Sequence, residues 1–183
     1  KAMNRRKIRA AAVLACTVLL LGLAGCGLFG AGKSTTEGRI GDSIRTDFFE
    51  FTVNSAYLCS EFEGRAASEG TELLVVDATV KNTFNESIPM SDWDFQAQWG
   101  EDDDDEAYAF PITSDPETGE EIAAVSEDQL PYEYELGVDE RVEGLLVYEV
   151  PEGYKDFSIS TQDIYSDGTT GDTYFVYFTP ERQ

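Results

Sequence analysis

The sequence predicts an all-β fold, an antiparallel sandwich built from seven or eight short strands. Most of the chain after residue 41 consists of segments in which apolar and polar residues alternate, which is the pattern of half-buried strands. The two clearest segments, 48–57 and 73–81, lack the 3.6-residue period of a helix. Turn-forming Gly, Pro and Asn residues separate the segments, as they do in sandwiches of short strands.

The first two strands set the expected core. In the first, Phe49, Phe51 and Val53 alternate with polar residues, and the strand ends near Tyr57. The second, over 73–81, has an N-terminal half that is apolar on both faces, as expected of a central strand. We expect its inner face to consist of Leu74, Val76, Ala78 and Val80.

Weaker alternation continues to the end of the chain. A turn at 82–86 follows the central strand, and Pro111 and Pro180 each end a later strand. The remaining expected strands are, in order, 93–99, 107–110, 142–150, one around Phe157 and Ile159, and 174–178.

The N-terminal segment has the composition of a secretory signal peptide. A basic cluster at residues 5–9 precedes an apolar run over 10–25. The alternative is a transmembrane helix, but this run of about 16 residues is shorter than the ~20 that a bilayer requires. It ends in four residues that resemble the bacterial lipobox: Leu23, Ala24, Gly25 and Cys26. The resemblance implies cleavage before Cys26 and attachment of diacylglycerol to its thiol, so the membrane would be a partner through lipid.

The expected organisation therefore has three parts. Residues 1–25 are a lipoprotein signal peptide, and residues 26–41 are the lipidated cysteine with a flexible linker rich in Gly, Ser and Thr. Residues 42–183 are long enough for one domain with a single core, the β-sandwich.

Composition excludes several functional classes. The first 25 residues hold five of the 13 basic residues and none of the 36 acidic ones, so the rest of the chain is strongly anionic and unsuited to nucleic acid. The chain has no histidine, which excludes Ser-His-Asp and Cys-His catalysis. Of three cysteines only Cys59 remains outside the signal segment and the lipobox, so no disulfide framework is expected. We expect Cys59 to be buried at a strand end.

The order of these signals is similar to the immunoglobulin-like, telokin-like domain of unknown function found on lipoproteins of monoderm bacteria. The resemblance spans roughly residues 41–179 and rests on Gly41-Asp42, Leu74–Thr83, Gly137-Val138, Gly144–Pro151 and a last strand rich in Phe and Tyr. A secreted immunoprotective antigen with a related sandwich belongs to the same broad group. The resemblance implies an immunoglobulin-like sandwich that is anchored at the outer face of the cell membrane and has no assigned catalytic residues.

One motif points to nucleotide binding. Residues 27–34, Gly-Leu-Phe-Gly-Ala-Gly-Lys-Ser, match the phosphate-binding P-loop pattern. A working P-loop follows a buried strand and opens a helix. Here the preceding apolar run is the signal segment, and 35–41 has two glycines and no apolar stripe. We therefore expect no nucleotide partner.

Six successive acidic residues, 101–106, are the candidate for metal chemistry. Carboxylates favour hard cations, and neighbouring acids such as Asp115 would help to complete a weak Ca²⁺ site. The Ca²⁺-loop pattern is imperfect, because no glycine follows the run at the required place. The alternative is a solvated hairpin tip. The candidate ligands are Asp102, Asp103, Asp104 and Asp105, and no other cofactor is expected.

Aromatic residues are the last signal. Most aromatic residues of a sandwich belong to its core, but a few on one exposed face can bind protein or glycan. Tyr132 and Tyr134, between Pro131 and Gly137, are the expected exposed pair. The sequence thus favours a membrane-anchored, non-catalytic binding or surface-display module, with an envelope or extracellular protein or glycan as partner. The alternative is a cation-binding or envelope-stress accessory protein that uses the acidic run.

Overall fold

The computed structural model describes residues 33–100, 107–113, 115, 118 and 120–183, and these residues are almost entirely strand and turn. Within them the one helical element is the single turn η1 (Asp92–Asp94), and no helix is long or apolar enough to cross a membrane. The strands are β1 (Thr35–Arg39), β2 (Ile44–Arg45), β3 (Phe49–Cys59), β4 (Glu61–Phe62), β5 (Arg65–Ala66), β6 (Thr71–Asn82), β7 (Ile88–Ser91), β8 (Gln96–Trp99), β9 (Tyr108–Ala109), β10 (Glu133–Leu136), β11 (Arg141–Pro151), β12 (Phe157–Ile164), β13 (Thr170–Phe178) and β14 (Glu181–Arg182).

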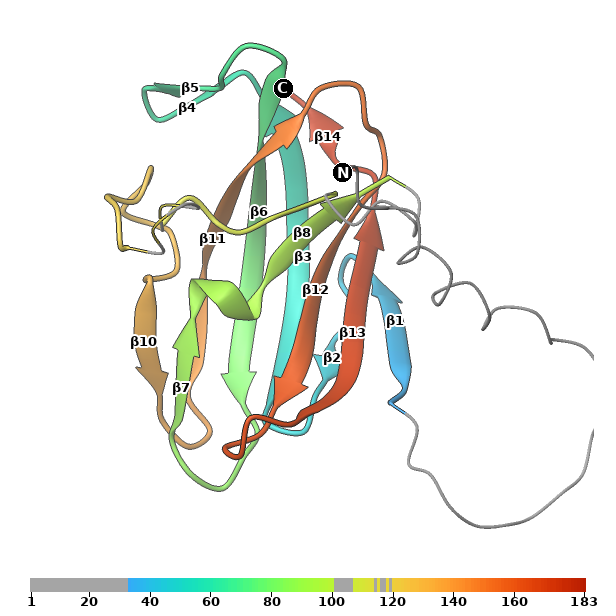
Figure 1. The fold of residues 1–183 in the computed structure, drawn as a ribbon, viewed down its shortest axis with the longest axis vertical. Helices are drawn as coiled ribbons and strands as arrows, with labels where there is room; N and C mark the ends of the chain where they lie inside the picture. Colours follow the sequence, from blue (N-terminus) through green and yellow to red (C-terminus); the bar gives the residue numbers. More distant parts are fainter. Residues whose placement is uncertain (1–32, 101–106, 114, 116–117, 119) are drawn as a thin grey trace, which may run out of the picture. The chain divides into compact units, whose positions relative to one another are not determined.

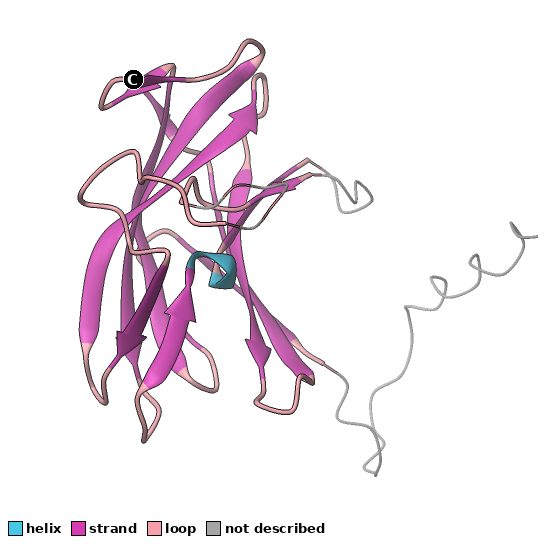
Figure 2. Cartoon of the chain, turned by 60° about the vertical axis from the view of Figure 1, so that its left-hand side comes forward, coloured by secondary structure: helices cyan, strands magenta, loops and turns pink. Residues whose placement is uncertain are grey.

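The strands form two main sheets that pack face to face (Figures 1 and 2). One sheet has the order β1-β13-β12-β8-β9, and the other has the order β11-β6-β3-β14 with β2 also paired to β3. Two small two-stranded sheets, β10-β7 and β4-β5, accompany them. The prediction of an all-β sandwich with mainly antiparallel pairing is confirmed.

The predicted strand number and the strictly antiparallel pairing are wrong. The described residues hold fourteen strands, of which several are only two residues long and therefore too short for alternation to reveal. β1 runs parallel to β13, and β14 runs parallel to β3. Both are terminal strands added at a sheet edge, and no tight turn ties their direction to that of their neighbour.

The predicted linker is too long at its C-terminal end. Residues 35–39, which we expected to be flexible, form β1 and pair with β13 from Thr173 to Tyr177. Backbone pairing holds this strand, and Gly38 allows it to lie against the core: a Cβ there would be 2.5 Å from Cδ1 of Ile44. A polar strand held in this way shows no apolar alternation in its sequence.

The core lies between the two sheets. The predicted inner face of β6 is confirmed, since Leu74, Val76, Ala78 and Val80 are all buried there. Ile159 of β12 and Val176 of β13 face them from the other sheet and are both fully buried. In β3 the pairing slips between Val53 and Ser55, so the inward side chains continue beyond this bulge as Ala56 and Leu58.

A second, smaller core explains why the first half of β6 is apolar on both faces. Leu73, Val75 and Val147 point away from the main core and pack against Ile112. The loop that carries Ile112 is fixed there by a hydrogen bond of 2.7 Å from its backbone N–H to the carbonyl of Val147. Cys59 ends β3 in this cluster and is buried, as predicted; burial raises the pKa of its thiol.

The expected strand over 93–99 begins later than its alternation indicates. The carboxylate of Asp94 accepts a hydrogen bond of 2.6 Å from the Ser91 backbone N–H and so closes a turn at η1. Trp93 lies in that turn and is 45% exposed, whereas Phe95 and Ala97 are buried as the pattern predicts.

Candidate ligand-binding groove

The outward face of the β1-β13-β12-β8-β9 sheet carries a continuous row of side chains from five strands. Register places Arg39 beside Tyr177, Tyr177 beside Ser158, Ser158 beside Gln98, and Gln98 beside Tyr108. Because successive side chains of a strand alternate between faces, these five residues all lie on the face opposite the core.

A second row lies next to the first. Glu37 of β1 is paired with Phe175 of β13, which is paired with Ser160 of β12, which in turn is paired with Gln96 of β8. The two rows together make a surface of aromatic rings, hydroxyls and amides that is continuous across the sheet.

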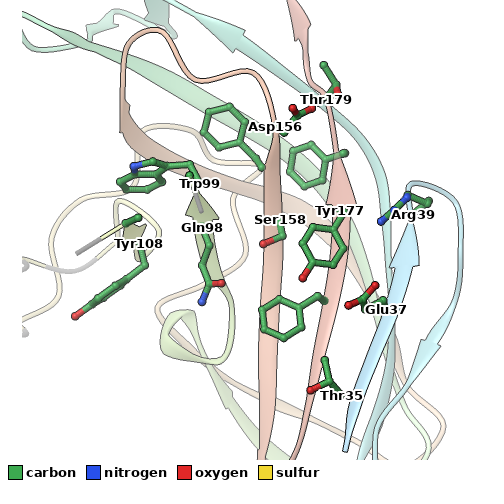
Figure 3. Close-up of a pocket in the computed structure, with 15 residues that line it drawn as sticks. Thr35, Glu37, Arg39, Gln98, Trp99, Tyr108, Asp156, Ser158, Tyr177 and Thr179 are labelled. Atoms are coloured by element: carbon green, nitrogen blue, oxygen red, sulfur yellow. Dashed lines mark hydrogen bonds between the residues drawn. The ribbon is translucent and has the colours of Figure 1, made fainter. Parts of the chain in front are cut away.

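Small residues on the middle strand turn this surface into a groove. Ser158 and Ser160 of β12 are only 4% and 5% exposed, since larger side chains rise on both sides of them. The resulting cavity has a volume of about 870 Å³, and Figure 3 shows it between Tyr177 on one side and Gln98 and Tyr108 on the other. This volume lies within the range of small-molecule and cofactor sites.

The β13 side of the groove is an aromatic wall. The rings of Phe175 and Tyr177 lie 5.7 Å apart between centroids, and their planes differ by only 16°. Both side chains are half-buried. The guanidinium of Arg39 lies 5.3 Å from the centroid of the Tyr177 ring and covers the outer end of the wall.

One end of the groove is polar and the opposite wall is partly aromatic. The hydroxyl of Thr179 donates a hydrogen bond of 2.6 Å to the carboxylate of Asp156, and both residues line the cavity. Trp99 lines the β8 side and packs against Tyr154 with 6.3 Å between ring centroids.

Tyr132 and Tyr134, the predicted exposed aromatic pair, do not contribute to this groove. Both are half-buried, so the expected exposure is wrong. Tyr134 lies in β10 opposite Met90 and packs against the main core. Within the described part of the chain its buried hydroxyl has no hydrogen-bond partner, and burial together with the nearby Asp94 raises its pKa. A role of either tyrosine in ligand binding stays a prediction.

The other candidate residues of the sequence analysis fall outside the described residues. These are the lipobox, Leu23, Ala24, Gly25 and Cys26, and the acidic run with Asp102, Asp103, Asp104 and Asp105. Among the residues that the structure does describe, no group of three or more Asp, Glu or Cys side chains is arranged to hold a metal ion. Weak Ca²⁺ binding by the acidic run stays a prediction.

The last two residues of the P-loop-like motif are described, and both contact β13. The backbone N–H and hydroxyl of Ser34 donate hydrogen bonds of 2.7 Å and 2.6 Å to the carboxylate of Asp172. The ammonium of Lys33 donates to the hydroxyl of Thr170. The two side chains that a P-loop directs at phosphate and Mg²⁺ thus fasten the start of the domain to β13.

The buried carboxylate of Asp163 has a structural role, because hydrogen bonds from other parts of the fold hold it. Burial raises its pKa, against the effect of a hydrogen bond of 2.7 Å from the hydroxyl of Tyr174. The Asp47 backbone N–H donates a second hydrogen bond, of 3.2 Å. These contacts tie the turn before β3 to β12 and β13, and Asp163 does not line the groove.

The sequence of the last strand carries one signal for the groove. Phe175 and Tyr177 alternate with Tyr174, Val176 and Phe178, so the last strand has aromatic residues on both faces. Since only one face can meet the core, the other pair had to lie on an outer surface. The residues of β1, β12 and β8 that lie beside Phe175 and Tyr177 are set by strand register, and no pattern in the sequence indicates them.

Comparison with known proteins identifies the family. The domain described as DUF4352, a domain of unknown function, matches residues 38–170. The chain belongs to this DUF4352 family. The match includes β12, β8 and β9 of the groove sheet, but only the last two residues of β1 and the first residue of β13, so Phe175 and Tyr177 lie beyond it. None of the curated proteins compared with the chain matches it.

Solved structures similar to this DUF4352 chain come from bacteria. A functionally unknown protein from Listeria monocytogenes EGD-e is 14% identical with a TM-score of 0.51, covering 79% of this chain and 84% of that one. The ycdA protein of Bacillus subtilis, a candidate lipoprotein, is 16% identical with a TM-score of 0.49; the match covers 73% of this chain but only 38% of ycdA. A β-sandwich protein from Clostridium difficile 630 is 17% identical with a TM-score of 0.42, covering 84% and 100%. The Listeria likeness shows a shared fold.

Proposed function

We propose that this DUF4352 chain is a membrane-anchored, extracytoplasmic lipoprotein whose sandwich binds a ligand in the groove of the β1-β13-β12-β8-β9 sheet without catalysing a reaction. The observation that carries the proposal is the aromatic wall of Phe175 and Tyr177 beside a floor of small serines. An outer sheet face that only needs solvation would carry charged side chains at such positions.

Membrane anchoring through Cys26 is part of the proposal. A basic cluster, a short apolar run and a lipobox-like end support it, and two acyl chains suffice for stable attachment. The domain would then stand on the outer face of the cell membrane of a monoderm bacterium. Lys33 and Ser34, which contact β13, would place the end of the linker beside the groove sheet.

We further propose that the sandwich is immunoglobulin-like and distantly related to the secreted immunoprotective antigen. Two face-to-face sheets of mainly antiparallel strands support this assignment. The parallel edge strands β1 and β14 are departures from that pattern.

A non-catalytic role is favoured by the side chains available. The chain lacks histidine, and the deeply buried carboxylate of Asp163 is occupied by Tyr174 and the Asp47 backbone, away from the groove. The groove carboxylates Glu37 and Asp156 lie on β1 and before β12, on opposite sides of the aromatic wall.

Binding to cell-envelope material tests the proposal. The full chain, kept in a detergent without a sugar head group, is sedimented with isolated envelopes of a monoderm bacterium. We expect the double variant Phe175→Ala with Tyr177→Ala to bind about tenfold more weakly than the native chain, a difference of about 1.4 kcal/mol. The matched control is Trp93→Ala with Phe84→Ala, which removes two exposed aromatic side chains outside the groove. Equal binding by the native chain and both variants would refute the groove as the ligand site.

A further inference from the structure

We propose that the groove binds a neutral, extended polysaccharide, of the class of flat β-1,4-linked pyranose chains, which lies along β12. This inference rests on the proposed function and names the chemistry of its ligand.

The aromatic wall suits a sugar ring. A pyranose ring has a flat face of C–H groups, and an aromatic ring offers a matching apolar face with a polarised π-system. Phe175 and Tyr177 are stacked on each other along β13, with 5.7 Å between their ring centroids and 16° between their planes, so together they form one continuous apolar block. A block of this kind along one strand matches the C–H face of an extended flat ribbon, whereas a coiled α-linked glucan would turn away from it.

The polar side chains suit the edges of the same ribbon. Sugar hydroxyls both donate and accept hydrogen bonds, so they need partners of both kinds. Ser158 on the floor has a hydroxyl, and Gln98 on the far wall has an amide; both groups donate and accept. The carboxylate of Asp156 accepts at the end of the groove.

Charge selects a neutral ligand. Outside the first 25 residues the chain holds 36 acidic residues and only eight of its 13 basic ones, so it repels polyanions such as nucleic acid. Within the groove, Glu37 and Asp156 are accompanied by the guanidinium of Arg39, which is engaged with the Tyr177 ring. No set of cationic groups among the described groove residues would capture a phosphate or carboxylate polymer.

An extended peptide is the competing occupant, and the geometry favours it less. Peptides that bind sheets usually pair with a free edge, where unpaired backbone groups supply the hydrogen bonds. Here the groove runs over the face of the sheet, and the backbone of β12 is already paired with β13 on one side and β8 on the other. A peptide in this groove would meet side chains only.

Fluorescence of Trp99, which lines the groove and also packs against the main core, serves as the reporter of binding. The chain has two tryptophans, and Trp93 lies outside the cavity lining, so Trp93→Phe leaves Trp99 as the single reporter. The full chain with this change, in the same sugar-free detergent, is titrated with cellohexaose and chitohexaose. Maltohexaose is the coiled neutral control and polygalacturonate is the anionic control. We expect a saturable change in Trp99 emission with at least one of the two β-1,4-linked probes, and none with the two controls.

Variants in the same background locate the binding. Tyr177→Ala and Phe175→Ala should each weaken it about tenfold, and Gln98→Ala a few fold, with Phe84→Ala unchanged. Tyr177→Leu keeps an apolar side chain without the flat ring and should weaken binding equally, which separates the ring from folding effects. Thermal unfolding confirms that each variant is folded.

The outcomes separate this inference from the function on which it rests. Absence of saturable binding of both β-1,4-linked probes at about 1 mM would overturn the inference. If envelope binding still required Phe175 and Tyr177 in that case, and survived digestion of the polysaccharide but not of the peptides, the groove would be a peptide site. Equal affinity for polygalacturonate would overturn the charge selection. If neither envelopes nor glycans depended on the aromatic wall, both proposals would be wrong.

Discussion

Arg39 and Tyr177 join the N-terminal strand to the groove, with the guanidinium 5.3 Å from the centroid of the tyrosine ring. Arg39 is exposed and lies on β1, a polar edge strand that is otherwise held by backbone pairing to β13. The contact therefore stabilises one border of the proposed ligand site by about 0.5–1 kcal/mol.

We predict that Arg39→Ala loosens β1 without unfolding the sandwich. Hydrogen exchange at the β1 amides should become severalfold faster, while exchange in β6 stays as slow as in the native chain. Arg45→Ala, which removes an exposed arginine from β2, is the control and should leave β1 unchanged. Equal protection of β1 in the native chain and in Arg39→Ala would show that backbone pairing alone holds the strand.

Gly144 of β11 is predicted to be intolerant of a side chain. A Cβ there would lie 2.8 Å from Cδ2 of Leu130 and 3.1 Å from the carbonyl oxygen of Asp128. The Asp128 carbonyl also accepts a hydrogen bond of 2.8 Å from the Leu145 N–H, so the segment cannot move away freely.

Gly144→Val should therefore lower the free energy of unfolding by about 1–3 kcal/mol, the usual cost of overpacking. Urea unfolding measures it. Glu143→Val places the same residue at the exposed neighbouring position and serves as the control. Equal stability of the two variants would mean that the 128–130 segment is not fixed against β11.

The long strands could be predicted because the apolar residues in their own sequences show which side chains face the core. β3, β6 and β11 are eleven or twelve residues long, and each places a run of apolar side chains on the core side. The edge strands β1 and β14 were not predictable, because a polar strand that is held by its partner's backbone needs no apolar face.

The groove was only partly predictable for a related reason. The sequence puts Phe175 and Tyr177 on one face, but their neighbours Glu37, Ser160 and Gln98 come from distant parts of the chain and meet only through register. The prediction that Tyr134 is exposed was wrong for a similar reason. Its alternation with glutamates indicates a half-buried strand, but it does not tell which face of that strand packs on the core.

Val76 tests the assignment of the inner face of β6. It is fully buried between its neighbours Ala56 on β3 and Leu146 on β11. Val76→Asp would bury an unpaired charge and should cost at least about 3 kcal/mol of stability, measured by thermal or urea unfolding. Val138→Asp makes the same change at a position that is 52% exposed and should be nearly neutral. An unchanged melting temperature for Val76→Asp would contradict the core described above.

Glu149 is predicted to stabilise the fold in a pH-dependent way. Partial burial acts to raise the pKa of Glu149, but hydrogen bonds from Ser68, Thr71 and Arg65 outweigh it and lower the pKa from 4.5 to about 2. The Ser68 N–H and the Thr71 hydroxyl donate at 2.7 Å and 2.8 Å. A pKa that is lower in the folded state gives stability that is fully present above about pH 4.5 and is lost as the pH falls toward 2.

Glu149→Gln should therefore be less stable than the native chain by about 1 kcal/mol at pH 7, after allowance for solvent screening. The difference should shrink steadily below pH 4.5 and vanish near pH 2. Urea unfolding at a series of pH values measures it, with the exposed Glu152→Gln as control. A difference that did not change with pH would assign the effect to packing and not to the charge.

The proposed lipid anchor is tested at Cys26. Diacylglycerol transfer requires a thiol, so Cys26→Ser should abolish incorporation of labelled fatty acid and leave a precursor that keeps residues 1–25. Metabolic labelling followed by mass spectrometry of the membrane fraction measures both effects. Cys16→Ser lies in the same apolar run but leaves Leu23, Ala24, Gly25 and Cys26 intact, so it should be labelled and cleaved as in the native chain. A native chain that is retained in the membrane without fatty acid, or a Cys26→Ser chain that is labelled normally, would overturn the anchor.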